Sequence, residues 1–282
     1  MTLSIIIVNY NTERILANCL SSIYTNNRNI KLEVFVVDNA SVDNSVKMIK
    51  QQFPQVKLIR NKKNLFYSFA NNQGLSKITG KYFLILGSDT IVLKGSLGKM
   101  IAFMKRVKDC GMASCRELDE NGETIVTCHA FSTPLTQIFE MPLFNHFMKN
   151  NKALSEFRYK DWDRKDIRDV DTIPGSFMLG RREVLQAVGG FDEKLPLFYS
   201  DADFCKRAKD KGFGIYHNGN VAIIHLKAAS LKFFSFSKVM QFAYRDMIYY
   251  HKKHFGIIPV IPLWILAKIH LVYYALKEKL YL

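Results

Sequence analysis

The sequence predicts an α/β protein with a mostly parallel central sheet flanked by helices, followed by a helical extension. Short aliphatic runs alternate with segments of helical spacing from Leu3 to Thr90, as is typical of parallel strands covered by helices. Beyond residue 230 the pattern changes to amphipathic helical spacing with many aromatic and basic residues. We therefore divide the chain into a main domain of residues 1–230 and an extension of residues 231–282.

The composition is that of a folded globular protein. Of the 282 residues, 48% are hydrophobic and 23% are charged, a balance that excludes a disordered chain. The five cysteines are odd in number and lack CxxC spacing, so we expect reduced thiols in a cytosolic protein and no zinc site. The first residues have neither a basic region nor a cleavage site, and we expect them to form a buried strand and not a secretory signal.

The elements of the main domain follow from the spacing of apolar residues. The first strand, over 3–8, is apolar on both faces, as central parallel strands are. We expect the alternation to continue as strands 33–37, 56–60 and 82–86, with helices 13–24, 42–53 and one that ends near residue 78. A further strand is expected over 221–224, with His225 at its end.

Polar residues follow three of these strands. The strand ends carry Asn9-Tyr10-Asn11, Asp38-Asn39 and Ser88-Asp89. A single aspartate at such a place is usually a turn former. Three polar strand ends on one edge of a parallel sheet instead favour a ligand site, because ligands bind beyond the carboxyl ends of the strands.

Several common sites are excluded by missing motifs. No GxGxxG follows the first strand, and the chain contains neither GxxxxGK[ST] nor GxSxG. The first two absences argue against a dinucleotide fingerprint and a P-loop, and the third against the usual serine hydrolase. A nucleotide at this edge must therefore be held by side chains and a metal ion.

The segment from Cys110 to Val170 supports few inferences. We expect a hairpin turn around 119–122, an aromatic stretch (Phe139, Phe144, Phe147) and a solvent-exposed charged run, DWDRKDIRDVD. No function is assigned to this segment.

The stretch FYSDADFCKR places Asp201 and Asp203 where an apolar loop meets a helix. Taken alone, it is a helix start with Ser200 or Asp201 as the N-cap and acids facing the positive end of the helix dipole. Carboxylates at such a junction are costly to desolvate, so a chemical role is the alternative. His225 is likewise either structural or a metal ligand.

The extension has a strong basic bias. From Lys206 to the C-terminal residue there are 13 Lys or Arg and 3 Asp or Glu, which accounts for ten of the fifteen net positive charges. We expect a helix over 233–254, an apolar run over 255–267 broken by two prolines, and a second helix. The apolar run is shorter than the ~20 residues that span a bilayer.

Aromatic, Lys-rich segments of this kind favour the interface of an anionic membrane leaflet. Charge alone would also suit nucleic acid or a diphosphate, but the aromatic pattern leads us to predict membrane contact and no nucleic acid. Packing on the main domain or on a second subunit, as in a homodimer, is the alternative that the sequence leaves open.

Taken together, the motifs resemble family 2 glycosyltransferases with the GT-A fold, in their rhamnosyltransferase-like branch. The resemblance is carried, in the family's order, by SIIIVNYN (4–11), VVDNASVDNS (36–45), NKKNLFYSFANNQG (61–74), YFLILGSDT (82–90), the stretch 174–213 and VAIIHLKAAS (221–230).

The resemblance implies a role for each matching residue. Tyr10, Asn11, Asp38 and Asn39 would line the nucleoside pocket, with Ser88, Asp89, Gly175 and Arg181 (or Arg182) as further donor contacts. Asp89 and His225 would hold Mg²⁺ or Mn²⁺, and Asp201 would be the catalytic base.

The implied activity is that of a metal-dependent inverting hexosyltransferase. It would move a sugar, such as rhamnose, from a nucleotide-diphosphate donor to a glycan or lipid-linked acceptor in bacterial surface polysaccharide synthesis. We expect it to be cytoplasmic and peripheral on the inner face of the cell membrane. The alternatives are a nucleotidyltransferase, which would usually have a glycine-rich loop after the first strand, and a catalytically silent glycan-binding or assembly subunit.

Three positions depart from the family pattern. Gly87 replaces the first acid of the DxD-type motif, and Ser200 replaces the Glu of the ED pair. Phe66 stands where a glycine is usual. The first two departures are the evidence for a silent subunit.

Overall fold

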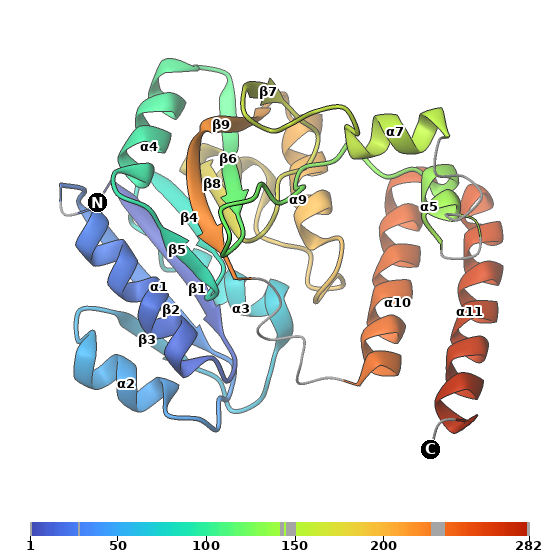
Figure 1. Ribbon diagram of the computed structural model, residues 1–282, viewed down its shortest axis with the longest axis horizontal. Coiled ribbons are helices and arrows are strands. Elements are labelled where there is room, and N and C mark those ends of the chain that lie inside the picture. The colour runs from blue at the N-terminus through green and yellow to red at the C-terminus, as the bar shows by residue number, and fades with distance from the viewer. Residues whose placement is uncertain (1, 28, 142–143, 145–150, 227–234, 281–282) are drawn as a thin grey trace.

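The computed structural model describes residues 2–27, 29–141, 144, 151–226 and 235–280. In this part of the chain nine strands form one sheet in the order β3-β2-β1-β4-β8-β6-β9-β5, with β7 paired to β9 (Figure 1). The strands are β1 (Leu3–Asn9), β2 (Leu32–Asp38), β3 (Lys57–Arg60), β4 (Tyr82–Leu86), β5 (Thr90–Val92), β6 (Cys110–Leu118), β7 (Ile167–Asp169), β8 (Phe177–Arg181) and β9 (Gly214–His225).

The first four long strands form the predicted parallel half of the sheet. β1 pairs in parallel with both β2 and β4, and β2 with β3. The register sets Asn9 opposite Asp38, so the polar ends of neighbouring strands lie side by side. The other half is mixed, because β8 runs antiparallel to both β4 and β6, while β6 and β9 are parallel.

Helices cover both faces of the sheet. The helices are α1 (Glu13–Asn26), α2 (Ser45–Gln52), α3 (Phe66–Leu75), α4 (Ser96–Arg106), α5 (Pro134–Glu140), α7 (Lys152–Arg158), α8 (Arg182–Val188), α9 (Ser200–Asp210), α10 (Phe236–Phe255) and α11 (Ile261–Leu280), with a 3-10 turn at Ile258–Val260. α1, α2 and α4 share a core with Ile5 and Ile7, whereas α3, α8 and α9 pack with Ile6 on the other face. The result is the three-layer arrangement that alternating strands and helices predict.

Two predicted helix boundaries are wrong. α2 begins at Ser45 and not near Val42, because Asp43 accepts hydrogen bonds from the Ser45 and Glu13 backbone N–H groups and thereby favours a turn before the helix. α3 ends at Leu75, three residues before the predicted end at Ile78.

The extension consists of the antiparallel pair α10 and α11, which stands beside α5 in Figure 1. The two helices share a small core in which Met141 packs with Tyr244, Met247, Leu263 and Ala267. Pro262 lies in the first turn of α11, so the helix begins inside the predicted apolar run. Of the described helices, none is long and apolar enough to cross a membrane. Three predictions lie outside the described residues. They are the domain boundary at residues 230 and 231, the end of the last motif from residue 227 onward, and the helix start at Phe233.

Candidate functional site

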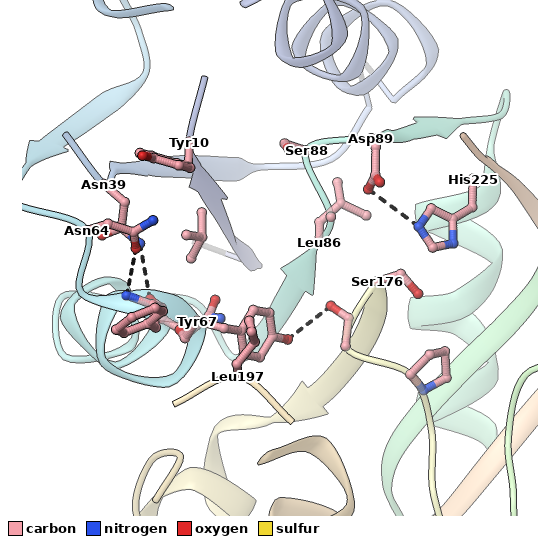
Figure 2. Close-up of a pocket in the computed structure, with 16 residues that line it drawn as sticks. Tyr10, Asn39, Asn64, Tyr67, Leu86, Ser88, Asp89, Ser176, Leu197 and His225 are labelled. Atoms are coloured by element: carbon pink, nitrogen blue, oxygen red, sulfur yellow. Dashed lines mark hydrogen bonds and ion pairs between the residues drawn. The ribbon is translucent and has the colours of Figure 1, made fainter. Parts of the chain in front are cut away.

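A cavity of about 350 Å³ opens at the carboxyl ends of β1, β2 and β4 (Figure 2). Its walls come from the strand ends, from the start of α3, and from the segment before β8. The lining residues are Val8, Tyr10, Asn39, Asn64, Phe66, Tyr67, Asn71, Leu86, Gly87, Ser88, Asp89, Pro174, Gly175, Ser176, Leu197 and His225. The cavity thus lies where the polar strand ends predicted a ligand site.

Tyr10 and Asn39 lie at one end of this cavity, as predicted for a nucleoside pocket. The Asn39 side chain donates through Nδ2 to the Phe66 carbonyl, 3.1 Å away, and accepts through Oδ1 from Asn61 at 2.9 Å. Asn39 therefore ties the end of β2 to the start of α3, and both elements form the wall of the cavity.

Asp38 and Asn11 have supporting positions instead. Neither is among the lining residues. The buried Asp38 carboxylate accepts from Asn9 Nδ2 at 2.9 Å and from the Ser41 backbone at 3.1 Å. Asn11 Oδ1 accepts from the Val42 backbone at 2.8 Å. These bonds fix the loops that carry Tyr10 and Asn39. Asp38 and Asn11 therefore support the cavity wall without lining it.

The loops around the cavity hold non-glycine residues in the left-handed region. Asn11, Ala40, Phe66 and Tyr199 have φ values of 54°, 64°, 62° and 59°. Such conformations cost on the order of 1–3 kcal/mol each and cluster at functional sites. The value at Phe66 also explains why a glycine suits this position, since glycine has no Cβ penalty there.

At the other end of the cavity, Asp89 faces His225 from the neighbouring strand end (Figure 2). His225 Nε2 lies 3.4 Å from Asp89 Oδ1, and His225 Nδ1 lies 2.6 Å from Glu117 Oε2. Glu117 is fully buried at the end of β6 and also accepts a hydrogen bond from Ser176 Oγ. It orients the imidazole so that Nε2 points to Asp89.

This arrangement fits a divalent cation between Asp89 and His225. Burial lowers the pKa of His225, but its hydrogen bonds to Asp89 and Glu117 and the charges of these carboxylates outweigh that effect and raise the pKa to about 10. A cation would occupy the place of the Nε2 proton, and a carboxylate behind a metal-binding histidine is the usual supporting arrangement.

No group of three or more His, Cys, Asp or Glu side chains within the described residues could hold a metal ion. Two protein ligands suit Mg²⁺ or Mn²⁺ bound together with diphosphate oxygens and water.

Asp201 lies in the first turn of α9 and lines not this cavity but a second one, which shares Pro174 with it. The N-cap of α9 is Tyr199, so the prediction of Ser200 or Asp201 as the N-cap is wrong. Asp201 Oδ1 accepts from the Ala202 backbone at 2.8 Å. Burial raises the pKa of the Asp201 carboxyl, although the backbone N–H groups of Ala202, Gly175 and Asp201 itself partly offset this effect.

The remaining predicted donor contacts divide into two groups. Ser88 and Gly175 line the cavity. Arg181 does not, because it lies at the end of β8 and its guanidinium donates to the carbonyls of Met104, Val107 and Cys110. The interpretation of Arg181 as a donor contact is not supported by this position, since Arg181 pairs with Tyr82 at the start of β4 and the cavity lies at the other end of that strand.

Helix α10 supports the site through hydrogen bonds and ion pairs of two buried carboxylates, Asp246 and Asp203, which the sequence did not reveal. Asp246 Oδ2 accepts from the backbone N–H groups of Leu197 and Phe198, at 3.3 and 3.0 Å. Asp203 Oδ1 contacts Lys253 at 2.7 Å and His254 at 2.8 Å. The loop before α9 and its first turn are therefore held by a helix of the extension.

Comparison with known proteins shows the family of the chain. The family model described as glycosyl transferase family 2 matches residues 4–189, about two thirds of the chain. The chain belongs to glycosyl transferase family 2.

The curated relatives of this family 2 protein include a rhamnosyltransferase and an O-antigen biosynthesis protein. An N-acetylglucosaminyl-diphospho-decaprenol L-rhamnosyltransferase of Mycobacterium tuberculosis is 22% identical over 210 residues, which cover 71% of this chain and 68% of the relative. The O-antigen biosynthesis protein RfbC of Myxococcus xanthus is 22% identical over 219 residues, which cover 77% of this chain but 16% of RfbC.

The solved structures confirm the GT-A fold. The mannosyltransferase PcManGT from Pyrobaculum calidifontis, in complex with GDP-Man and Mn²⁺, superposes with a TM-score of 0.61 at 16% identity over 95% of this chain and 69% of that chain. The prediction of an α/β GT-A fold from the strand-end pattern and the motifs is therefore confirmed. The sequence did not predict the strand directions in the second, mixed half of the sheet, which the structure shows.

Proposed function

We propose that this family 2 glycosyltransferase is a metal-dependent, inverting hexosyltransferase. It moves a sugar, rhamnose or another hexose, from a nucleotide-diphosphate donor to a glycan or lipid-linked acceptor in bacterial surface polysaccharide synthesis. One observation carries this proposal: Asp89 and His225 line the cavity at the strand ends, and Asp201, a carboxylate of raised pKa, lines a second cavity that shares Pro174 with it.

Asp201 suits the role of general base. A carboxylate with a raised pKa holds a proton more tightly, so its ionised form is a better acceptor of the proton of an attacking hydroxyl. As the acceptor oxygen forms its bond to the anomeric carbon, its proton passes to the Asp201 carboxylate. The bond from that carbon to the diphosphate oxygen breaks, and its electron pair leaves with the nucleoside diphosphate.

The described cavity wall favours a single displacement. Asp89 is the only carboxylate among the described residues that line it, and it faces His225. A covalent route would need a second carboxylate at the anomeric carbon. With one base and no such nucleophile, attack comes from the side opposite the diphosphate and inverts the configuration.

Asp89 and His225 are the residues that would hold the divalent cation. Among the described residues lining the cavity there is no Lys or Arg, so the charge of a leaving diphosphate needs another counter-charge. A bound Mg²⁺ or Mn²⁺ supplies this neutralisation. Glu117 keeps the His225 ring in place through Nδ1.

The proposal is tested with a donor screen that measures released nucleoside diphosphate. Rhamnose, glucose, galactose and N-acetylhexosamine donors are compared, with and without EDTA. Asp201→Asn keeps an oxygen for the Ala202 N–H and should lower transfer by about 10²–10⁴-fold without weakening donor binding. Asp210→Asn, exposed on the same helix, is the matched control. Full turnover of the Asp201 variant, or full activity in EDTA, would refute the base or the metal assignment.

The extension is proposed to contact an anionic membrane surface. Apolar residues are exposed along the 3-10 turn and α11: Ile257, Ile258, Ile261, Trp264, Ile265, Ile269, Val272 and Tyr273. Lys268 Nζ lies 5.8 Å from the centroid of the Trp264 ring. Lys252 lines a surface groove together with Ile257, Ile261 and Trp264. Exposed apolar side chains beside cations suit the interface of an anionic leaflet.

Flotation with anionic liposomes measures this contact. The double variant Trp264→Glu, Ile265→Glu should stay with the soluble fraction, while Val42→Glu, an exposed position on the main domain, should float like the parent. Equal flotation of both variants, or a concentration-dependent dimer that the double variant abolishes without liposomes, would contradict membrane contact.

A further inference from the structure

A second cavity of about 410 Å³ adjoins the donor cavity, and the proposed function leaves it unassigned. Pro174 lines both cavities, and Asp201 lines the second. The second cavity is built largely from the region without recognisable motifs. It is defined here by residues 126–130, Ser132, Gln137, Glu140, Phe157, residues 172–174, Phe198, Tyr199, Asp201 and Ala202. A hydroxyl of a molecule bound in the second cavity would lie within reach of the Asp201 carboxylate.

One wall of the second cavity is aromatic. The His129 ring stacks on Phe157 with centroids 5.4 Å apart and an interplanar angle of 24°. Both rings line the cavity and are partly exposed. Aromatic side chains in a cavity wall suit the apolar face of a sugar ring, since they combine a large apolar surface with fixed geometry.

Other lining residues of the second cavity are polar and uncharged. Gln137 Oε1 accepts hydrogen bonds from Tyr199 Oη and from Ser132 Oγ, the latter at 3.3 Å. Ser132 Oγ also lies 3.2 Å from His251 Nε2 on α10. These bonds hold Gln137 in one orientation at the cavity wall, as is typical of the few fixed polar groups that orient a ligand in an otherwise apolar pocket.

The charges of this wall disfavour phosphate. None of the described lining residues is Lys or Arg. Of its two carboxylates, Glu140 is paired with Arg158 at 2.6 Å, and Asp201 is the base. Burial, together with the positive charges of Arg164 and Arg158, lowers the pKa of His129, so this imidazole is neutral at pH 7. Phosphate sites normally supply cationic donors, which these residues lack.

Building on the proposed function, we propose that the second cavity binds an uncharged sugar ring of the acceptor. The ring lies on His129 and Phe157, and one of its hydroxyls reaches Asp201. The acceptor group at the reaction centre is therefore a neutral glycosyl unit and not a phosphorylated sugar or polyol.

Ligand-observed NMR by saturation transfer tests this without turnover. The probes are methyl glycosides of glucose, galactose, mannose, rhamnose and N-acetylglucosamine, with glucose 6-phosphate and mannose 6-phosphate in parallel. Two variants change the cavity in opposite ways: Phe157→Ala removes the aromatic wall, and Ala130→Trp fills the space. Leu135→Ala, exposed on α5 and outside the cavity lining, is the matched control. UDP, GDP and dTDP with Mn²⁺ are titrated separately into each protein.

We expect at least one neutral glycoside to give saturation transfer with the parent and the control, and the phosphates to give none. Either cavity variant should weaken that signal by about tenfold, since an anchoring aromatic contact is worth roughly this factor, while nucleotide binding persists. Equal signals in both cavity variants, equal signals from the 6-phosphates, or no signal from any neutral glycoside would overturn the inference. Failure of every nucleotide to bind would instead refute the proposed function.

Discussion

Replacing Asp203 by Asn should destabilise the protein in a way that depends on pH. Asp203 is fully buried in the first turn of α9, with Arg207 at 2.8 Å on one oxygen and Lys253 and His254 on the other. Burial raises the pKa of this carboxyl, but the hydrogen bonds from His254 and Lys253 and the charge of Arg207 outweigh it and lower the pKa from 3.8 to about 2.

The size of the effect follows from that pKa. At 1.36 kcal/mol per pKa unit, a fall from 3.8 to about 2 corresponds to roughly 2.5 kcal/mol of folding free energy at pH 7. Because the folded pKa is depressed, this stabilisation is present above pH 4 and is lost as the pH falls toward 2. At pH 3 about half of it should remain. The asparagine variant lacks the charge at every pH.

Urea denaturation of the parent and of Asp203→Asn at pH 7 and pH 3 measures this difference. We expect a gap of roughly 2.5 kcal/mol at pH 7 and about half that at pH 3. Asp210→Asn, which removes a largely exposed pair with Lys206, should change the free energy of unfolding by less than about 1 kcal/mol. A gap below about 0.5 kcal/mol at pH 7, or one unchanged at pH 3, would refute the assigned ion pairs.

Three further predictions concern the cavity. Glu117→Gln should weaken Mn²⁺ binding by about 10–100-fold, because His225 loses the carboxylate that orients it; isothermal titration with bound nucleoside diphosphate measures this, and an unchanged affinity would contradict the metal assignment. Phe66→Gly and Phe66→Ala both remove the ring contact with Phe242. At a φ of 62°, the glycine variant should be more stable than the alanine variant by about 1 kcal/mol, because glycine has no Cβ. Equal thermal unfolding of the two variants would argue against backbone strain at this position. The raised pKa of Asp201 should shift the acidic limb of the transfer rate upward, since only the carboxylate accepts a proton; initial rates from pH 4 to 8 would contradict this if the limb fell at an ordinary aspartate pKa.

The parallel half of the sheet and its ligand edge were predictable because they depend on local patterns. Aliphatic runs fix β1, β2 and β4, and the short polar segments after them fix which edge carries the cavity. The sequence alone could place Tyr10, Asn39 and Asp89 at this edge. Each follows the carboxyl end of an assigned parallel strand, and these ends lie at the same edge of the sheet.

Glu117 could not be recognised in the same way. Its contact with His225 joins residues 108 positions apart and depends on β6 pairing with β9 in parallel, a pairing that no local pattern encodes. The one available signal was the charged pair Arg116-Glu117 near the end of a mostly apolar run, Cys110–Leu118. A carboxylate buried at such a place needs partners, so it pointed to an unseen contact.

The prediction of Arg181 as a donor contact failed because a motif that is continuous in sequence does not stay at one place in the fold. The motif segment from Pro174 onward reaches the cavity at Gly175, but β8 then carries the chain away from it along β4. Six residues after Gly175 the chain is at the far end of the sheet, where Arg181 binds backbone carbonyls. Closeness in a motif is therefore no guide to closeness in space once a strand lies between.

The structure also changes what the extension means for catalysis. Three contacts join α10 to the site: Asp246 to the loop at Leu197, the Lys253–Asp203 pair to the first turn of α9, and the Phe242 ring to Phe66 at 4.9 Å. Without α10 the Leu197 N–H would lose its acceptor and Asp203 two of its partners. Since unpaired buried groups are costly, the loop that presents Asp201 depends on α10 for its shape. The α11 surface that we propose contacts a membrane is thus joined, through α10, to the loop that carries Asp201, the proposed base.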